Sequence, residues 1–327
     1  MFWDTERFAR LAEGAILGFA VGDALGVPAE FMERSALRRD PVQAMRSGGV
    51  HGQPAGTWSD DTSMTLCAMD SLIAAGIDYD DLMRRFSDWL LHASNTAHGT
   101  VFDVGNTCRR AIFAYADGAD PLACGQAGEF ACGNGSLMRV LPVALYLAGR
   151  FGAVQLDDCI AGILHDTSKC THAHPRCQMA CGIYCAVAFA LCRGGSLNQA
   201  VQSGILSSLS YYREKAEFAQ VAPEFEALIR IERRAEAQIE STGYVLHTLE
   251  AALWCLSTTR SYQACVCKAV NLGGDADTTA AVAGGLAGLW YGEAGIPREW
   301  AEATAGYASI RARCGRFAAA CLCAHNA

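Results

Sequence analysis

The chain has 327 residues and a net charge of −8, with apolar residues at 51% of its positions and charged residues at 18%. The negative charge argues against a nucleic-acid binder, which would carry a basic face. The amino-terminal stretch 1–14 has mixed charge and does not resemble a secretion signal. The most apolar windows, 182–192 and 278–292, are too short to span a bilayer, so we expect a cytoplasmic protein with no membrane span.

Helical periodicity dominates the chain from its first residues onward. Apolar residues recur at three- and four-residue steps over 5–22, after a capping Asp4 or Thr5. Alternating strand patterns, polar linkers and fixed-period repeats are not found. We therefore predict an all-α fold with one compact domain over residues 1–327. The same pattern predicts further helices over 62–75, 79–92, 135–149, 196–212, 222–240, 243–256 and 278–290.

Glycines recur inside the apparent helices near both ends of the chain. Each one costs up to ~1 kcal/mol in a helix interior, so a packing reason is expected. Close approach of two helix backbones supplies that reason. A phosphate-binding loop does not, because no G-x-G-x-x-G follows a strand and no G-K-[ST] occurs. The glycines are Gly14, Gly18, Gly22 and Gly26, then Gly284, Gly285 and Gly288.

The sixteen cysteines do not form the pattern of a short secreted disulfide scaffold, and no C-x-x-C occurs. Cys177, Cys181 and Cys185 lie at four-residue steps on one helical stripe. A soft metal site with His172 or His174 is one interpretation. We favour the other, in which reduced cysteines serve as small buried apolar residues.

Two aspartate-rich turns precede predicted helices far apart in the chain. One capping side chain contributes about 1 kcal/mol to a helix start, so capping explains one aspartate of each pair and leaves the second unexplained. Carboxylates and hydroxyls together are the ligands of a hard divalent cation. Spacing alone leaves both interpretations open, because Asp-rich turns are common in loops. The turns are TWSDDTSM, with Ser59, Asp60 and Asp61, and GGDADTT, with Asp275, Asp277 and Thr278.

Further polar groups interrupt the apolar helical pattern. Each one alone is more often a cap, a turn or a satisfied buried group. Together they are typical of a site built from loops on an apolar scaffold. They are Asp23 and Glu30 in GDALGVPAEF, Asp103 and Asn106 in VFDVGNTC, the possible anion nest GNGS at 133–136, and His172 in THAHP.

These stretches, in this order and spread over 14–292, resemble the ADP-ribosylglycohydrolase family. Within it they are most similar to the dinitrogenase-reductase-activating glycohydrolases and the ADP-ribosylarginine hydrolases. The resemblance implies a compact orthogonal helical bundle with two Mg²⁺ or Mn²⁺ ions at the base of an ADP-ribose cleft. It also implies an enzyme whose substrate is an ADP-ribosylated protein, modified most often on arginine, and whose product is ADP-ribose.

The resemblance also assigns residues motif by motif. Glu30, near the metals and the scissile ribose, joins Asp60 and Asp61 as the implied catalytic carboxylates; Asp61 or Glu30 would be the base. The implied metal ligands are Ser59, Asp60, Asp61, Asp275, Asp277 and Thr278. The implied substrate contacts are Asp103, Gly105 and Asn106 at the ribose and the modified side chain, Gly135, Ser136, Met138 and His172 around the diphosphate and distal ribose, and Tyr244 at the cleft edge.

Two other functions stay open at this point. A catalytically inactive ADP-ribose-binding protein would use the same fold, although all the expected oxygen ligands are retained here. A metal-dependent nucleotide phosphohydrolase would use the same metals but release phosphate. The products formed from an ADP-ribosylated arginine peptide distinguish the three.

Overall fold

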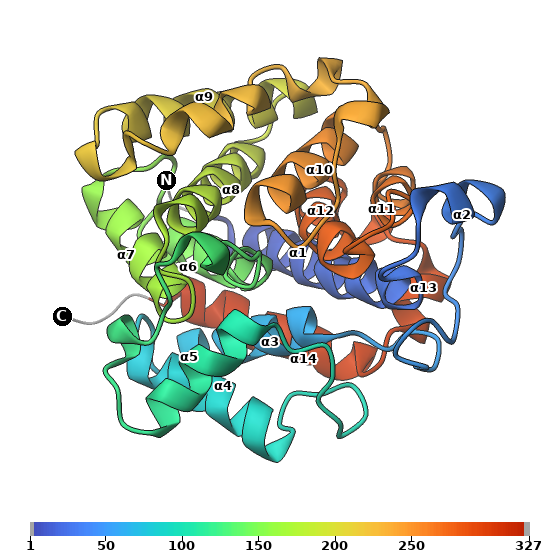
Figure 1. Cartoon of the computed structure of the whole chain (residues 1–327), viewed down its shortest axis with the longest axis horizontal. Helices are drawn as coiled ribbons and strands as arrows, with labels where there is room; N and C mark the ends of the chain where they lie inside the picture. Colours follow the sequence, from blue (N-terminus) through green and yellow to red (C-terminus); the bar gives the residue numbers. More distant parts are fainter. Residues whose placement is uncertain (1–2, 324–327) are drawn as a thin grey trace.

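The computed structural model describes residues 3–323, and helices account for its regular structure (Figure 1). The ends of the expected domain, residues 1–2 and 324–327, lie outside the described part. Within 3–323 the only β pairings are isolated bridges, so the predicted all-α class is confirmed. The α-helices are α1 (Thr5–Gly26), α2 (Arg34–Arg39), α3 (Asp60–Ala74), α4 (Tyr79–His92), α5 (Asn106–Ala116), α6 (Leu141–Arg150), α7 (Asp158–Lys169), α8 (Pro175–Arg193), α9 (Leu197–Arg213), α10 (Val245–Ser257), α11 (Tyr262–Val270), α12 (Ala276–Tyr291), α13 (Arg298–Ala303) and α14 (Tyr307–Leu322).

Short 3₁₀ turns connect several of these helices. They are η1 (Val27–Ala29), η2 (Pro121–Ala123), η3 (Glu129–Ala131), η4 (Leu137–Arg139), η5 (Ala216–Phe218), η6 (Ala222–Leu228), η7 (Ile231–Arg233), η8 (Glu236–Gln238) and η9 (Glu293–Gly295).

Helices α1 and α12 pack against each other backbone to backbone. A Cβ at Gly22 would lie 2.2 Å from the carbonyl oxygen of Ala280, and one at Gly18 would lie 2.5 Å from that of Gly284. A Cβ at Gly26 would lie 2.3 Å from the Cα of Asp277. The glycines therefore serve helix packing, as the sequence predicts, and they bring the carboxyl end of α1 against the amino end of α12.

Most predicted helices are found within a few residues of their expected ends. Helix α1 begins after Asp4, whose carboxylate accepts hydrogen bonds from the amides of Glu6 and Arg7. The expected helix 135–149 is divided, because a 3₁₀ turn over 137–139 precedes α6.

The prediction of a helix over 222–240 is wrong. The segment consists of the turns η6, η7 and η8, and Arg230 between them has a left-handed backbone with φ of 57°. Its buried Phe225, Leu228 and Ile231 recur at three-residue steps. That spacing fits a 3₁₀ turn as well as an α-helix, so the apolar pattern cannot separate the two.

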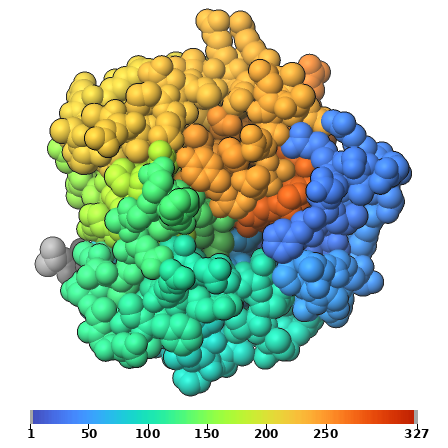
Figure 2. Space-filling model, viewed as in Figure 1, coloured from blue at the N-terminus to red at the C-terminus, as the bar shows by residue number. Residues whose placement is uncertain are grey.

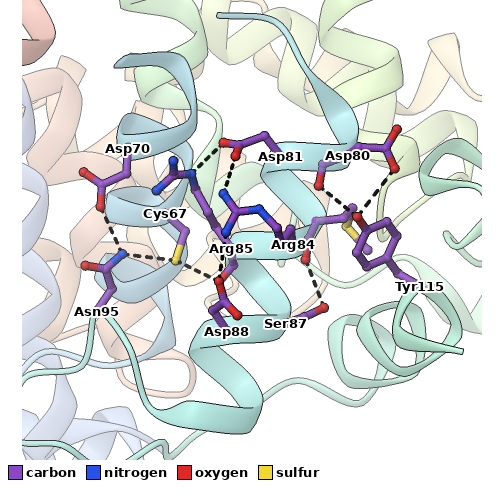
Figure 3. A network of polar contacts seen from close by, with 11 residues as sticks. Cys67, Asp70, Asp80, Asp81, Arg84, Arg85, Ser87, Asp88, Asn95 and Tyr115 are labelled. Carbon is purple, nitrogen blue, oxygen red and sulfur yellow. Dashed lines mark hydrogen bonds and ion pairs between the residues drawn. The ribbon is translucent and has the colours of Figure 1, made fainter. Parts of the chain in front are cut away.

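A polar network joins α3, α4 and α5 (Figure 3). The guanidinium of Arg85 binds Asp81 at 2.6 Å, and Arg84 bridges Asp81 and Asp88 along the exposed side of α4. The Tyr115 hydroxyl of α5 donates to the carbonyl of Asp80 at 3.0 Å. Exposed pairs of this kind contribute little individually. Helix α3 joins the network through the Cys67 thiol, which donates to the carbonyl of Arg85 at 3.5 Å. Helix α4 thus contacts both α3 and α5, and these two helices begin at the site described below.

All sixteen cysteines are unpaired, and all but Cys159, Cys267 and Cys323 are buried. Cys177, Cys181 and Cys185 are fully enclosed on α8. Within residues 3–323 the three-residue clusters with metal-ligating geometry contain none of the cysteines. The structure therefore favours the expected role as small apolar core residues over a soft metal site.

Two helices are longer and more apolar than the sequence windows suggest. The segments Thr5–Ala29 and Pro175–Arg193 could cross a membrane by length and composition alone. Residues 182–192 lie inside the second of them, so the expectation that this window is too short does not hold for the whole helix. However, 83% and 89% of the respective apolar windows are buried within the protein. A core helix passes the same test, so this is weak evidence for a span.

Alanine at Gly22 is expected to destabilise the protein by about 2 kcal/mol or more, because its Cβ would meet backbone rather than a movable side chain. Gly162 in α7 is the matched control, since a Cβ there meets nothing within 4 Å. Alanine at Gly162 should be neutral or stabilising by up to about 1 kcal/mol. Urea unfolding of the two variants measures the difference, and equal effects would contradict the close helix packing.

Candidate metal centre and substrate cleft

A cavity of about 550 Å³ opens on the face shown in Figure 2, where blue, green and orange parts of the chain meet around a hollow. Seven stretches that are distant from one another in sequence supply its walls. Those segments contribute Glu30, Phe31 and Asp60; Asp103, Val104, Gly105, Asn106, Thr107 and Cys108; Gly133, Asn134, Gly135 and Met138; His172; and Thr242, Gly243, Gly274, Asp275 and Thr278.

The first aspartate-rich turn starts α3 without using its own aspartates as caps. Ser59 is the N-cap, and its hydroxyl accepts from the amide of Asp61 at 3.3 Å. Asp23 of α1 completes the cap: its carboxylate accepts from the amides of Ser59 and Thr62 at 2.9 and 3.0 Å. The capping explanation for Asp60 and Asp61 is therefore wrong, because other residues satisfy the helix start.

The second turn starts α12 beside the first. Asp275 is the N-cap position but makes no capping hydrogen bond; its Oδ2 accepts from the Asn134 side chain at 2.8 Å. Oδ1 of Asp277 accepts from the amide of Thr278 at 2.9 Å. The Thr278 hydroxyl lies 3.4 Å from Oδ1 of Asp61, which joins the two turns.

Three buried carboxylate oxygens at these turns have no hydrogen-bond partner within residues 3–323. They are Oδ2 of Asp61, Oδ1 of Asp275 and Oδ2 of Asp277. Carboxylate oxygens of Asp23, Asp61 and Asp277 all lie within 4.8 Å of one another. An unpartnered buried carboxylate is strongly unfavourable unless a cation balances it. Clustered oxygen ligands with free lone pairs therefore fit a hard divalent cation such as Mg²⁺ or Mn²⁺.

The electrostatics of the cluster lead to the same conclusion. Burial, reinforced by the neighbouring carboxylates, raises the pKa of Asp60, Asp61 and Asp277 well above the usual value. Burial also raises the pKa of Asp23 to about 6, although its hydrogen bonds oppose the shift. These groups resist ionisation when crowded together, and a divalent cation favours their charged forms.

A second acidic group forms the cavity wall nearest α1. The Glu30 carboxylate lies 2.5 Å from Nε2 of His51, and Oδ1 of Asp103 lies 3.7 Å from the same nitrogen. Burial, followed by the charge of Asp103, raises the pKa of Glu30 to about 9. Burial raises the pKa of Asp103 to about 7 and lowers that of His51. This wall therefore holds protons that it can exchange with a bound molecule.

Two wall residues have strained backbones. Phe31 and Asp103 have φ values of 60° and 56°, in the left-handed region that side chains other than glycine seldom adopt. The Phe31 amide donates to the carbonyl of Gly274 at 2.7 Å, and the Gly274 amide donates to the carbonyl of Met32 at 3.0 Å. These bonds fix the Phe31 ring at the mouth, where it is 64% exposed. Strain of this kind is concentrated at functional sites.

The opposite wall is formed by the loop 133–136, which pairs with the segment before α10. The Asn134 amide donates to the carbonyl of Gly243 at 3.0 Å, and the Val245 amide donates to that of Cys132 at 3.0 Å. A Cβ at Gly135 would lie 2.6 Å from Sγ of Cys108 and 2.8 Å from Cε1 of His172, so only glycine fits there.

The structure places most of the expected site residues at one cavity. Asp61, Asp277 and Ser59 are buried beneath the wall formed by their neighbours. Ser136 points away from the cavity, with its hydroxyl 2.9 Å from that of Ser168. Tyr244 lies outside the lining, and its hydroxyl donates to Glu224 at 3.3 Å. The residues that line the cavity as expected are Glu30, Asp60, Asp103, Gly105, Asn106, Gly135, Met138, His172, Asp275 and Thr278.

Sequence reasoning left several groups at the site without a role. It named Asp23 as a charged residue in an apolar, glycine-rich helix and Asn134 as part of a possible anion nest, but it assigned neither to the metal centre. In the structure Asp23 caps α3 and Asn134 binds Asp275. His51 and Phe31 carried no local signal, since their roles depend on contacts with distant segments.

Comparisons with known proteins agree with this arrangement. The sequence model of the ADP-ribosylglycohydrolase family matches residues 4–325. This chain belongs to the ADP-ribosylglycohydrolase family. It is 32% identical over 298 residues to ADP-ribosylarginine hydrolase Tri1 of Pseudomonas putida, with 90% of this chain and 74% of that protein covered.

Two further relatives of this family member cover most of its length. ADP-ribosyl-[dinitrogen reductase] glycohydrolase of Rhodospirillum rubrum is 32% identical over 292 residues, with 88% of each chain covered. A solved structure described as an ADP-ribosylglycohydrolase-related protein complex superposes with a TM-score of 0.78 at 30% identity, covering 96% of this chain and 99% of that one. The helical fold is therefore that of the family.

Without a bound metal, the stability of this protein is expected to depend on pH. The folded-state pKa values of Asp23, Asp103 and Glu30 are raised to about 6, 7 and 9. Their contribution to stability is fully present below the ordinary carboxyl range and is lost as the pH rises through 6 to 9. In EDTA the melting temperature should therefore fall over this range.

Excess Mg²⁺ or Mn²⁺ should raise the melting temperature, and should raise it more at pH 8 than at pH 6 because ionised carboxylates bind cations more tightly. Differential scanning fluorimetry with and without EDTA measures both effects. A melting temperature that rises with pH in EDTA would contradict the proton-holding cluster.

Proposed function

We propose that this protein is a metal-dependent hydrolase that removes ADP-ribose from modified protein side chains, with N-linked ADP-ribosylarginine as the substrate linkage. The observation that carries the proposal is the set of unpartnered carboxylate oxygens of Asp61, Asp275 and Asp277 at the base of a cavity. Membership of the family supplies the class of reaction. The proposed compartment is the cytoplasm, and the proposed unit of function is one domain over the whole chain.

Two divalent ions, Mg²⁺ or Mn²⁺, are the proposed cofactors. When bound, such ions polarise ribose hydroxyls and lower the pKa of water toward neutrality. The oxygen-rich donor set favours these ions over soft metals. The residues proposed to hold them are Ser59, Asp60, Asp61, Asp275, Asp277 and Thr278.

The proposed proton transfers use the cavity wall. Glu30 and Asp60 line the cavity, whereas Asp61 is fully enclosed and does not. We therefore assign Asp61 to metal binding and consider Glu30 or Asp60 as the group that exchanges a proton with the reacting atoms. The Glu30 carboxyl, whose pKa burial raises and which lies 2.5 Å from Nε2 of His51, is placed to give a proton to a departing guanidine nitrogen.

The hydrogen-bond acceptors and the aromatic ring of this wall support arginine as the modified residue. A guanidinium would meet the carboxyls of Glu30 and Asp103 and the exposed ring of Phe31, which are groups that bind guanidinium. The name of one relative, ADP-ribosylarginine hydrolase, points the same way. The name of another, ADP-ribosyl-[dinitrogen reductase] glycohydrolase, indicates an ADP-ribosylated protein as its substrate.

The remaining expected contacts divide between the two ends of the cavity. Asp103, Gly105 and Asn106 are proposed to orient the reacting ribose and the modified side chain, since the amino terminus of α5 begins there. Gly135, Met138 and His172 are proposed to contact the diphosphate and distal ribose. Ser136 would act indirectly, because it lies behind this wall, and Tyr244 would act at the outer edge.

Asp61→Asn is expected to lower the rate of ADP-ribose release by more than about 100-fold, beyond the loss usual for groups that only support a metal ligand. The matched control is Asp157→Asn, because Asp157 is a plain N-cap that accepts from the amide of Ile160 at 2.8 Å. Asparagine caps about as well as aspartate, so this control should keep full activity.

Circular dichroism and melting temperature accompany the assay of Asp61→Asn. The metal-free variant should melt at or above the wild-type temperature, because one crowded carboxylate has been removed. Wild-type turnover of Asp61→Asn at saturating Mg²⁺ would contradict its assignment to the metal centre.

Mass spectrometry of the reaction products tests the function itself. An ADP-ribosylated arginine peptide with Mg²⁺ or Mn²⁺ should yield free ADP-ribose and unmodified peptide, at least about 10-fold faster than the serine-linked peptide. Release of phosphate would indicate a phosphohydrolase instead. Binding of ADP-ribose without turnover of either peptide would indicate an inactive binding protein.

A further inference from the structure

Arg139, at the end of η4, is a cation enclosed directly behind the glycine loop of the cavity. Its side chain is fully buried. Nε donates to the carbonyl of Gly135 at 3.2 Å, and Nη2 donates to the carbonyl of Thr167 at 3.1 Å and to the Thr171 hydroxyl at 2.7 Å. All three acceptors are uncharged, and Nη1 has no partner within residues 3–323.

Burying a guanidinium among neutral partners costs free energy, because the charge loses its hydration. A nearby opposite charge is needed to offset that loss. The ring of Phe86, 4.8 Å from the guanidinium carbon, supplies a modest cation–π attraction. The mechanism proposed above does not use Arg139. An anion bound in the cavity beside the loop 133–136 would balance the charge of Arg139.

Hydrogen bonds to Gly135 and Thr171 connect the enclosed Arg139 to the residues of the cavity wall. The Thr171 hydroxyl lies 2.8 Å from Nδ1 of His172. Because Arg139 donates to this hydroxyl, the hydroxyl proton is available for Nδ1. The proton of the neutral imidazole is then on Nε2, as a hydrogen-bond donor.

The imidazole is held in its neutral form on the cavity wall. Burial, and then the charge of Arg139, lowers the pKa of His172 to about 3. The ring lines the cavity between Gly133 and Gly135, whose missing side chains leave room for it. A neutral ring with Nε2–H donates a hydrogen bond at any physiological pH.

Arg139 gives the loop wall of the cavity a positive charge, because its guanidinium contacts this loop through Gly135 and its three hydrogen-bond acceptors are uncharged. Glu30 and Asp103 lie on a different wall. A diphosphate beside the loop would be attracted by the guanidinium, and the low polarisability of the surrounding protein would strengthen that attraction.

We propose that Arg139 is a positioning residue that provides the counter-charge of the diphosphate subsite through Gly135 and the Thr171–His172 pair. The proposal rests on the proposed function, because it takes the ligand to be a nucleoside diphosphate sugar. Arg139 acts behind the wall and does not touch the ligand.

The test compares a charged ligand with a neutral one on the Mg²⁺-loaded protein. Arg139→Met should weaken ADP-ribose binding by about 10- to 100-fold, the loss expected for one charge-assisted interaction in a buried site. Adenosine, which lacks the diphosphate, should bind within about threefold of wild type. Isothermal titration calorimetry measures ADP-ribose binding, and NMR titration measures adenosine binding.

Arg139→Lys keeps the charge but not the fork of hydrogen bonds to Gly135, Thr167 and Thr171. It should therefore recover part of the ADP-ribose affinity that Arg139→Met loses. With the modified arginine peptide, Arg139→Met should raise KM by about 10-fold or more while kcat stays within about threefold. Equal losses for ADP-ribose and adenosine, or a lysine variant as weak as the methionine variant, would overturn the proposal.

The Thr171→Val and Thr171→Ser pair tests the relay if Arg139→Met does not fold. Valine removes the hydroxyl and should weaken ADP-ribose binding by about 3- to 10-fold, whereas serine keeps it and should bind as wild type. Equal affinities of the two would overturn the relay.

Nitrogen-15 NMR of the wild-type protein should show the His172 proton on Nε2, and a proton on Nδ1 would overturn the assignment. A wild-type protein that binds no ADP-ribose would refute the proposed function, and with it the role of Arg139. If ADP-ribose binds and Arg139→Met binds equally well, only the inference fails.

Discussion

The close contact between α1 and α12 is the constraint on which the site depends. With glycine at each crossing point, the carboxyl end of α1 meets the amino end of α12 at backbone distance, down to Gly26 against Asp277. Asp23 lies on the last turns of α1 and therefore reaches the start of α3. A bulkier residue at the crossing would separate the two aspartate-rich turns. Packing and chemistry are here determined by the same residues.

Close packing also produces the electrostatic character of the site. Carboxylates brought together inside a protein cannot all remain ionised, and the raised pKa values of Asp60, Asp61 and Asp277 express that conflict. Among the described residues these three carboxyls have no basic partner, so a bound cation would reduce the unfavourable electrostatics that folding concentrates at this site.

Much of this arrangement follows from the sequence. Helical periodicity gives the fold class, and the surplus of oxygen ligands in two turns points to the metal centre. The helix predicted over 222–240 is wrong, because apolar residues at three-residue steps occur in 3₁₀ turns as well as in α-helices. The left-handed backbone of Arg230, which interrupts the segment, has no recognisable sequence pattern. Contacts between distant segments could not be predicted from the sequence either. The contact of His51 with Glu30 is one example. The capping of α3 by Asp23, rather than by Asp60, is another.

The cap that Asp23 provides to α3 has an evolutionary consequence. Because a residue on another helix satisfies the amides at this helix start, Asp60 and Asp61 contribute little to folding. A gene that lost either aspartate would still encode a stable protein with an intact cleft. With the proposed roles of these aspartates, one substitution would remove catalysis and leave the structure. Proteins descended from such a gene could then evolve functions in which the cleft binds its ligand without hydrolysing it.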